Sequence, residues 1–411
     1  MIEDIATDVS NKLINSTLSR DFDDFIGLRA HMEKIEPLLC IDSNEVRMIG
    51  IWGPPGIGKT TIARFLFSQL SGSNNFQHSV FMANIRETYT IPVCSDDYNA
   101  KLQLQQKFIS QIINHKDVEV THLGVAQERL KDKKVLVVLD GVDQLVQLEA
   151  MAKETRWFGH GSRIIITTQD LKLLKAHGIN HIYKVDFPPN SEALEIFCMY
   201  AFKQKYPKDG FEKLAWEVTV LAGKLPLGLR VMGSYFRGMC KQEWKNELPW
   251  LRNSLNGQLE SVLKFSYDAL CEKDKYLFLH IACFFNNRSV EVVEELLAHT
   301  FSNVRQGLHV LAQKSLISIN SEYIEMHNLL EQLGIEIVRK KYASEPGKQS
   351  IREPGRRQFL TDARDICEVL SDDTAVTFDT GILLHCSLQI ELLIISLIFY
   401  MCPFIRVVAV L

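Results

Sequence analysis

A glycine-rich stretch that ends in lysine and threonine constrains this chain most. Residues 53–60 read Gly-Pro-Pro-Gly-Ile-Gly-Lys-Thr and fit the pattern G-x-x-x-x-G-K-[ST] of phosphate-binding loops. Such a loop needs a strand before it and a helix after it. Residues Val46–Trp52 alternate like a strand, and Thr61–Phe67 reads as a helix without a breaker. The alternative, a chance glycine-rich turn, does not explain these two neighbours.

Each residue type in the loop has a physical task. The glycines Gly53, Gly56 and Gly58 let successive backbone N–H groups point at phosphate oxygens. The N-terminus of the following helix adds the positive end of its dipole. Lys59 reaches the β and γ phosphates, and the hydroxyl of Thr60 completes the shell of a Mg²⁺ ion.

Strand-like and helical segments alternate on both sides of the loop. Val135–Leu139 is a continuous apolar run, which is typical of a strand buried on both faces of a parallel sheet. Further strands are predicted at Val80–Asn84, Arg163–Thr168 and Ile182–Val185, with a helix at Leu102–Ile113. This order predicts an α/β fold with a parallel-sheet phosphate-loop domain and right-handed crossovers.

After Pro189 the pattern is helical only, and it starts at Ser191 with a sequence typical of a capped helix. Further on, three helices, two short strands and a helix follow the winged-helix plan. The three helices are expected at Asp274–Phe284, Val290–His299 and Val304–Gln313, and the two strands at Leu316–Ile319 and Tyr323–Met326. The predicted divisions are a linker helix (1–21), a nucleotide-binding domain (22–188), a helical domain (189–258), a winged-helix domain (259–343), a linker (344–386) and an apolar tail (387–411).

The overall composition is that of an ordinary soluble protein, with 46% apolar and 23% charged residues. The net charge of -4 argues against a specific nucleic-acid partner. Nine scattered cysteines without a C-x-x-C pair indicate reduced thiols, and the charged start Met1–Lys12 is not a signal peptide. These features predict a cytoplasmic protein.

The last twenty residues, Leu392–Leu411, are almost wholly apolar and long enough to cross a bilayer. Pro403 and Arg406 interrupt them. Three interpretations compete: a membrane anchor, a buried terminal element, or the fortuitous end of a truncated gene product. The third is favoured, and membrane association is expected only if the tail is a real anchor.

Acidic and polar residues follow two of the predicted strands. Asp140 ends the run Val135–Leu139, where it either holds Mg²⁺ opposite the phosphate loop or caps a turn. The next residue is Gly141, so a second adjacent carboxylate that could polarise water is absent, and Asp143 is the remaining catalytic candidate. At the end of Arg163–Thr168, where a γ-phosphate sensor is often placed, stands the uncharged Gln169.

Two later motifs each have a structural and a functional interpretation. Pro226, in the stretch Gly223–Leu229, either starts a helix or offers a flat apolar face to a purine. His327 is either a structural residue or a ligand of a β-phosphate. The winged-helix region 259–342 suggests a DNA-binding regulator, but its nine basic residues are outnumbered by eleven acidic ones. A structural role is therefore favoured for this region.

Taken in order, these motifs closely resemble the NB-ARC module of plant disease-resistance proteins, of the class that normally has a Toll/interleukin-1-receptor domain in front and leucine-rich repeats behind. The resemblance covers about residues 1 to 385. It rests on Asp21–Gly27, Gly50–Thr61, Phe81–Arg86, Val135–Asp143, Gly161–Asp170, Gly223–Leu229 and Met326–Leu330, with Arg356–Leu370 similar to the segment that joins the module to the repeats.

The resemblance implies a switch that is closed with ADP, opens on exchange for ATP and then oligomerises with other chains of the class. Mg²⁺ would accompany ATP at Thr60 and Asp140. His327 would touch the β-phosphate of ADP. The implied nucleotide-binding residues are Ile26, Gly27, Gly53, Gly56, Ile57, Gly58, Lys59, Thr60, Thr61, Pro226 and His327.

The chain departs from the family pattern at two positions. Gln169 replaces the usual sensor arginine, and Asn328 replaces the usual aspartate after His327.

No Toll-like domain and no repeats are expected in the chain, so no NAD-cleaving activity is assigned to it. The sequence therefore predicts a regulatory nucleotide switch and no fast enzyme. A slow ATPase and a winged-helix DNA-binding regulator are the alternatives.

Overall fold

The computed structural model describes residues 25–72, 75–88, 97–113, 120–253, 257–298 and 300–343, and three short strands beyond them. The predicted linker helix at 1–21 and most of the predicted linker and tail lie outside the described residues. The chain forms two compact units. The first runs to Val220 and also takes Lys224–Met239 and Gln313–Ser315; the second takes Leu221–Gly223, Cys240–Ala312 and the chain from Leu316 on.

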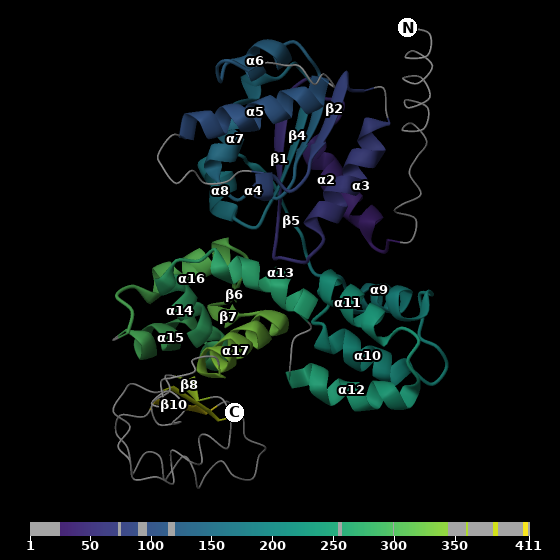
Figure 1. The fold of residues 1–411 in the computed structure, drawn as a ribbon, viewed down its shortest axis with the longest axis vertical. Coiled ribbons are helices and arrows are strands. Elements are labelled where there is room, and N and C mark those ends of the chain that lie inside the picture. Colours follow the sequence, from purple (N-terminus) through teal and green to yellow (C-terminus); the bar gives the residue numbers. More distant parts are fainter. Residues whose placement is uncertain are drawn as a thin grey trace. The chain divides into compact units, whose positions relative to one another are not determined.

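A five-stranded parallel sheet forms the core of the first unit (Figure 1). Its order is β2-β3-β4-β1-β5, with β1 at Arg47–Trp52, β2 at His78–Met82, β3 at Val135–Leu139, β4 at Arg163–Thr168 and β5 at His181–Lys184. Every residue of β3 and β4 is buried, which explains the continuous apolar sequence of β3 and the run Ile164–Ile166 within β4. The predicted parallel α/β sheet is confirmed. Because the strands are parallel, the carboxyl ends of β1, β3 and β4 meet at one edge.

Helices cover both faces of this sheet, with α2 and α3 drawn on one side and α5 and α7 on the other in Figure 1. The helices and short turns around the sheet are α2 (Leu28–Leu39), α3 (Lys59–Ser71), α4 (Ile85–Thr88), α5 (Asp97–Ile113), α6 (Val125–Leu130), α7 (Leu145–Met151), η2 (Thr155–Trp157) and α8 (Leu171–Ala176). Helices α9 (Asn190–Phe202), α10 (Glu212–Leu221) and α11 (Pro226–Phe236) follow. The apolar side chains of α5 and α7 pack on alternate residues of β3, which builds the main core.

The second unit contains the predicted winged-helix elements. Its helices are α12 (Lys241–Asn253), α13 (Gly257–Asp268), α14 (Glu272–His280), α15 (Val290–Leu297), α16 (Val304–Gln313, its last residue counted with the first unit) and α17 (Asn328–Ala343). A π-helical turn, η3 (Ile281–Phe285), extends α14, and β6 (Ser318–Asn320) pairs antiparallel with β7 (Tyr323–Glu325). Strands β8 (Phe359–Leu360), β9 (Gly381–Leu384) and β10 (Arg406–Ala409) form a small parallel sheet.

Two local expectations need correction. Helix α9 begins at Asn190, after Pro189, and no side chain caps it, so the predicted cap at Ser191 is wrong. The second strand lies at His78–Met82, two residues before its predicted start at Val80. Within the predicted tail, only Arg406–Ala409 is described, as strand β10. Among the described residues, no helix has both the length and the apolar character needed to cross a bilayer.

Candidate nucleotide site

The phosphate loop joins β1 to α3 at the carboxyl edge of the sheet. Gly56 and Gly58 have φ values of 77° and 101°, a left-handed conformation that side chains disfavour. Helix α3 begins at Lys59, and its N-cap residue Gly58 has no side chain to occupy the first backbone N–H groups. The predicted residues Ile57, Thr60 and Thr61 lie in this loop and the first turn of α3. The arrangement can direct a helix N-terminus at an anion.

The ammonium of Lys59 is folded back onto its own loop. Its Nζ donates to the carbonyl oxygens of Gly53 and Pro54, both at 2.8 Å. The pKa of Lys59 is lowered to about 7, mainly because the ammonium is buried. The negative charge of Asp140 opposes this shift, and the positive charge of Arg86 adds to it. A phosphate that took the place of these carbonyls would restore the ordinary charge of the ammonium.

Asp140 lies directly after β3 and is 1% exposed. Its Oδ1 accepts hydrogen bonds from Thr60 Oγ1 at 2.9 Å and from Thr167 Oγ1 at 2.7 Å. Thr167 in turn accepts from the backbone N–H of Gly141 at 2.8 Å. The structure therefore brings together the two residues predicted to hold Mg²⁺, although 80 positions separate them.

The donor set at Thr60 and Asp140 fits a Mg²⁺ ion that also binds nucleotide phosphates. A hydroxyl and one carboxylate are hard oxygen ligands, and Mg²⁺ in such sites takes most of its shell from phosphate and water. Within the described part of the chain, no group of three or more His, Cys, Asp or Glu side chains is placed to hold a metal by itself.

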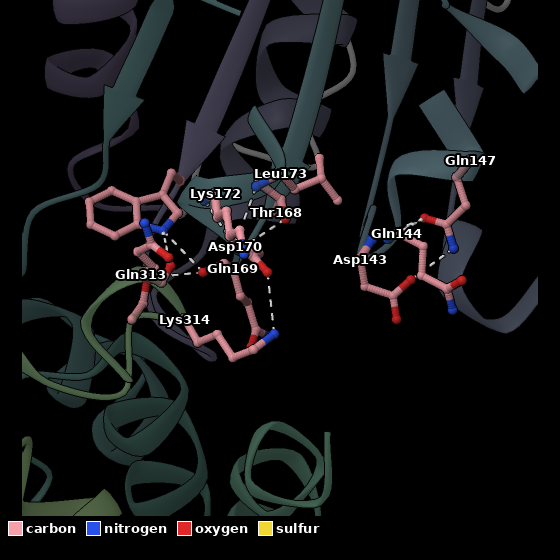
Figure 2. Close-up of polar contacts among 12 residues, drawn as sticks. Asp143, Gln144, Gln147, Thr168, Gln169, Asp170, Lys172, Leu173, Gln313 and Lys314 are labelled. Atoms are coloured by element: carbon pink, nitrogen blue, oxygen red, sulfur yellow. Dashed lines mark hydrogen bonds and ion pairs between the residues drawn. The ribbon is translucent and has the colours of Figure 1, made fainter. Parts of the chain in front are cut away.

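Asp143, the catalytic candidate, lies just past the end of β3 and is clamped by one buried amide (Figure 2). Gln147 Nε2 donates to Asp143 Oδ1 at 2.8 Å, and Gln147 Oε1 accepts from the backbone N–H of Asp143 at 3.0 Å. The pKa of Asp143 is raised, because removal of the carboxyl from water outweighs the opposing effects. These are the hydrogen bond from Gln147 and the charges of Arg86 and Lys314, which lower the pKa. The carboxyl is thus fixed in orientation, and the sequence analysis did not identify Gln147.

The segment around Pro226 lies against the phosphate loop. Pro226 is the first residue of α11, so the helix-start interpretation is correct. The next backbone N–H, of Leu227, donates to the carbonyl of Gly56 at 3.1 Å. A Cβ added at Gly56 would lie 2.9 Å from Leu227 Cβ and 3.2 Å from Leu225 Cδ2. A packing role of Pro226 on a purine stays a prediction.

Ile26 and Gly27 immediately precede α2. Gly27 has a φ of 80° and is the N-cap residue of that helix. A Cβ added at Gly27 would lie 2.8 Å from Glu192 Oε2, so this turn lies against the first turn of α9. The predicted adenine contacts are therefore on the same unit as the phosphate loop, and their contact with a base stays a prediction.

The end of β4 is held by a distant segment, Gln313–Ser315. Trp52 Nε1, at the end of β1, donates to the carbonyl oxygens of Gln169 at 3.0 Å and Gln313 at 3.3 Å. Ser315 Oγ also donates to the Gln169 carbonyl, at 3.2 Å. Lys314 Nζ lies 3.2 Å from Asp170 Oδ2, and Asp170 Oδ1 caps α8 (Figure 2). The sequence analysis missed this contact.

His327 belongs to the second unit, immediately before α17. Its Nδ1 accepts from the backbone N–H of Leu329 at 3.2 Å, so the proton of a neutral ring is on Nε2, which donates to the Gly223 carbonyl at 2.9 Å. Burial lowers the pKa of His327 and favours this neutral form. Asn328 Nδ2 donates to the Leu221 carbonyl at 2.8 Å, which an aspartate could not do. A phosphate contact of His327 stays a prediction.

Comparison with known protein families agrees with this architecture. Residues 28–207 match the NB-ARC domain family, and residues 271–342 match the winged-helix domain of the disease resistance protein Roq1-like family. Among solved structures, a Walker-type ATPase of Pyrococcus abyssi covers 78% of this chain and 96% of its own length at 12% identity, with a TM-score of 0.48.

Three curated proteins of Arabidopsis thaliana are similar over nearly the whole chain. They are a probable disease resistance protein RPP1 (61% identical, 91% of this chain, 30% of that protein), the disease resistance protein TAO1 (60%, 95%, 32%) and the disease resistance-like protein DSC2 (54%, 96%, 33%). The chain spans about a third of the length of these relatives. The predicted resemblance is confirmed: the chain contains an NB-ARC domain followed by a Roq1-like winged-helix domain, and it is similar over most of its length to plant disease-resistance proteins.

Proposed function

We propose that this chain is the ADP/ATP-binding switch module of a plant immune receptor. The observation that carries the proposal is that Lys59, Thr60 and Asp140 lie at the same edge of the sheet. Thr60 Oγ1 and Asp140 Oδ1 are 2.9 Å apart. This is the constellation that a Mg²⁺-triphosphate requires. ADP would occupy the loop in the resting state, and exchange for ATP would open the module and allow oligomerisation with related chains.

Nucleotide content tests the proposal directly. The full chain, purified without added nucleotide, is expected to release ADP on denaturation, as identified by mass spectrometry. Lys59→Ala should weaken binding about 10- to 100-fold, because it removes the charged hydrogen-bond donor of the loop. Lys172→Ala is the matched control, since it removes the same charge from an exposed side chain in the first turn of α8. Equal nucleotide content in the Lys59 variant and the wild type would contradict the site.

Slow hydrolysis is the second part of the proposal. Gly141 leaves no second carboxylate beside Asp140, and Gln169 brings no charge to the end of β4. We therefore expect turnover below the roughly 1 s⁻¹ low end of typical enzymes. One observation favours the alternative of an ATPase, because Gln147 orients the Asp143 carboxyl as a water-positioning base would need. Phosphate release well above that rate, lost in Asp143→Asn, would support the ATPase.

His327 is proposed to report the nucleotide state to the winged-helix domain. In the structure its Nε2–H is engaged by the Gly223 carbonyl, so a phosphate contact would require that bond to be exchanged. His327→Ala should then change the ADP dissociation rate. An unchanged rate, together with an unfolding temperature lowered as for any buried hydrogen-bonded residue, would leave His327 a structural residue.

A further inference from the structure

We propose that a cavity at the amino edge of the sheet binds an extended peptide of a partner protein, in which an apolar side chain stands between two acidic ones. The cavity has a volume of about 570 Å³, within the range of ordinary ligand sites. Its lining comes from the segments that precede β1, β3 and β4. The candidate nucleotide site lies where these parallel strands end, so the cavity is at the opposite edge and the inference goes beyond the proposed function.

Backbone hydrogen bonds fix the walls of the cavity relative to one another. The Gly161 N–H donates to the Asn44 carbonyl at 2.7 Å, which joins the segment before β4 to the segment before β1. The Gly159 N–H donates to the carbonyls of Leu130 and Lys133, both at 3.0 Å, which joins the segment before β4 to the segment before β3. The site is therefore formed before a ligand arrives, and binding costs little ordering of the protein.

The lining combines a buried apolar floor with a basic rim. Phe158 is 3% exposed and Val46 is half-buried, so an apolar side chain that reaches them leaves water. Lys131, Arg156 and His160 are exposed and bring an ammonium, a guanidinium and an imidazole N–H to the same cavity. An apolar anchor flanked by carboxylates matches both features.

The acidic side chain in the lining does not cancel this charge. Among the described residues that line the cavity, Glu45 is the one acid, and its carboxylate lies 3.2 Å from the guanidinium of Arg47. The backbone of Glu45 is fixed separately, because the fully buried Arg163 donates from Nη1 to its carbonyl at 2.8 Å. Glu45 is thus already paired, and its segment keeps its place when a ligand binds.

The rim cations are available to a ligand carboxylate. Arg156 pairs with Glu154 at the surface, where an ion pair contributes little and can be exchanged for another carboxylate. Lys131 and His160 have no carboxylate partner within the described part of the chain. A bound acidic side chain would therefore gain a charged hydrogen bond without breaking a buried one.

An extended peptide suits this cavity better than a single small anion. The cavity is open to solvent, since its three basic side chains are exposed. The Asn44 amide and the Thr155 hydroxyl also line it and make no hydrogen bond to other described residues, so both remain for backbone groups of a ligand. Alternate side chains of an extended chain point in opposite directions. The central apolar residue can thus face the floor while its two acidic neighbours stay at the rim.

The experiment measures binding of the blocked tripeptide acetyl-Glu-Leu-Glu-amide to the full chain by saturation-transfer difference NMR. We expect a dissociation constant of about 1 mM, with the leucine methyl protons saturated most strongly because they reach the buried floor. Acetyl-Gln-Leu-Gln-amide, which lacks the charges, should bind about ten-fold more weakly. Acetyl-Glu-Ser-Glu-amide, which lacks the anchor, should also bind about ten-fold more weakly.

Lys131→Glu tests where the peptide binds. It reverses one charge of the rim and should weaken acetyl-Glu-Leu-Glu-amide about ten-fold. His160→Gln should give a smaller loss of about two-fold, because the amide can still donate. Lys172→Glu is the matched control, since it reverses an exposed charge in the first turn of α8, beyond the carboxyl end of β4. A wild-type unfolding temperature in each variant shows that it is folded.

Four results would overturn the proposal. They are wild-type affinity in Lys131→Glu, the same loss in Lys172→Glu, equal affinities for the glutamate and glutamine tripeptides, and no saturation at about 5 mM tripeptide. Inorganic phosphate is the competing probe. If phosphate displaces the tripeptide at equal concentration, the cavity is a site for small anions and the peptide assignment is wrong.

Discussion

The neighbouring strands β3 and β4 end at the same sheet edge, yet their ends are held in different ways. Beyond β3, the central acceptor is a side chain: the Asp140 carboxyl accepts from the hydroxyls of Thr60 and Thr167. Beyond β4, the Gln169 backbone carbonyl accepts from Trp52 and from Ser315 of a distant segment. Side-chain networks restrict residue types and leave a motif in the sequence, whereas a backbone acceptor leaves none.

The largest expected effect compares two adjacent residues of β4. Thr167 and Thr168 are each 1% exposed, but their hydroxyls contact different strand ends. Thr167 Oγ1 donates to Asp140 beyond β3, whereas Thr168 Oγ1 accepts from the Asp170 N–H beyond β4 at 3.0 Å. Thr167→Val removes a donor to a buried carboxylate and an acceptor of the Gly141 N–H. We expect it to lower the free energy of unfolding by about 2–4 kcal/mol, against about 1 kcal/mol for Thr168→Val.

Urea unfolding of both variants measures this difference. A wild-type slope of the unfolding free energy against urea in both variants would show that the compared states are the same. Equal losses in the two variants would mean that the buried network at Asp140 contributes no more than an ordinary turn hydrogen bond, and the contrast between the strand ends would fail.

Local sequence was sufficient to predict the sheet and the β3 end. The phosphate loop and the apolar run Val135–Leu139 each specify a local conformation, and they place Lys59, Thr60 and Asp140 at one edge once the strands are parallel. Gln147 leaves only a weak signal in the sequence, an amide four positions after an aspartate at a helix start.

The β4 end was beyond sequence-based prediction for a physical reason. The contact of Trp52 with Gln313 spans 261 positions, and that of Lys314 with Asp170 spans 144. Gln313–Ser315 lies between an amphipathic helix and a short strand, and its composition is that of an ordinary polar turn. Hydrophobic periodicity predicts elements and their buried faces, but it carries no information about which turn meets which carbonyl.

The next prediction concerns the buried amide beyond β3. Gln147 is fully buried, and its side chain makes three hydrogen bonds, with Asp143 and with the backbone N–H of Gln144. Gln147→Met should lower the free energy of unfolding by about 2 kcal/mol and further slow the residual ATP hydrolysis. Gln105→Met is the control, because Gln105 is equally buried and donates to Leu123 and Ala150. Slower hydrolysis in both variants would make Gln147 a structural residue only.

The pH dependence of nucleotide binding tests the electrostatics of Lys59. Its pKa in the unliganded chain is about 7, and bound phosphates raise it. Below about pH 6 the ammonium is charged in both states, and binding should not depend on this group. Above pH 7 binding takes up a proton, so ADP affinity should fall by up to about ten-fold per pH unit. Lys59→Arg stays charged, and its profile should be flatter; identical profiles would contradict the lowered pKa.

The smallest expected effect lies at the β4 end and concerns Trp52. Its indole N–H is shared between the Gln169 and Gln313 carbonyls, at 3.0 and 3.3 Å, in a partly exposed position. Trp52→Phe keeps an aromatic ring and removes the donor, and water can replace it at both carbonyls. We therefore expect a loss of about 0.5–1 kcal/mol in the free energy of unfolding.

Proteolysis should be faster at Gln313–Ser315 and unchanged elsewhere, because this donor fixes that segment to the strand end. Ser315→Ala should do the same to a lesser degree, since Trp52 still holds the segment. If both variants resist proteolysis as well as the wild type, the distant segment is fixed by contacts other than these carbonyl hydrogen bonds, and the two strand ends differ less than their hydrogen bonds indicate.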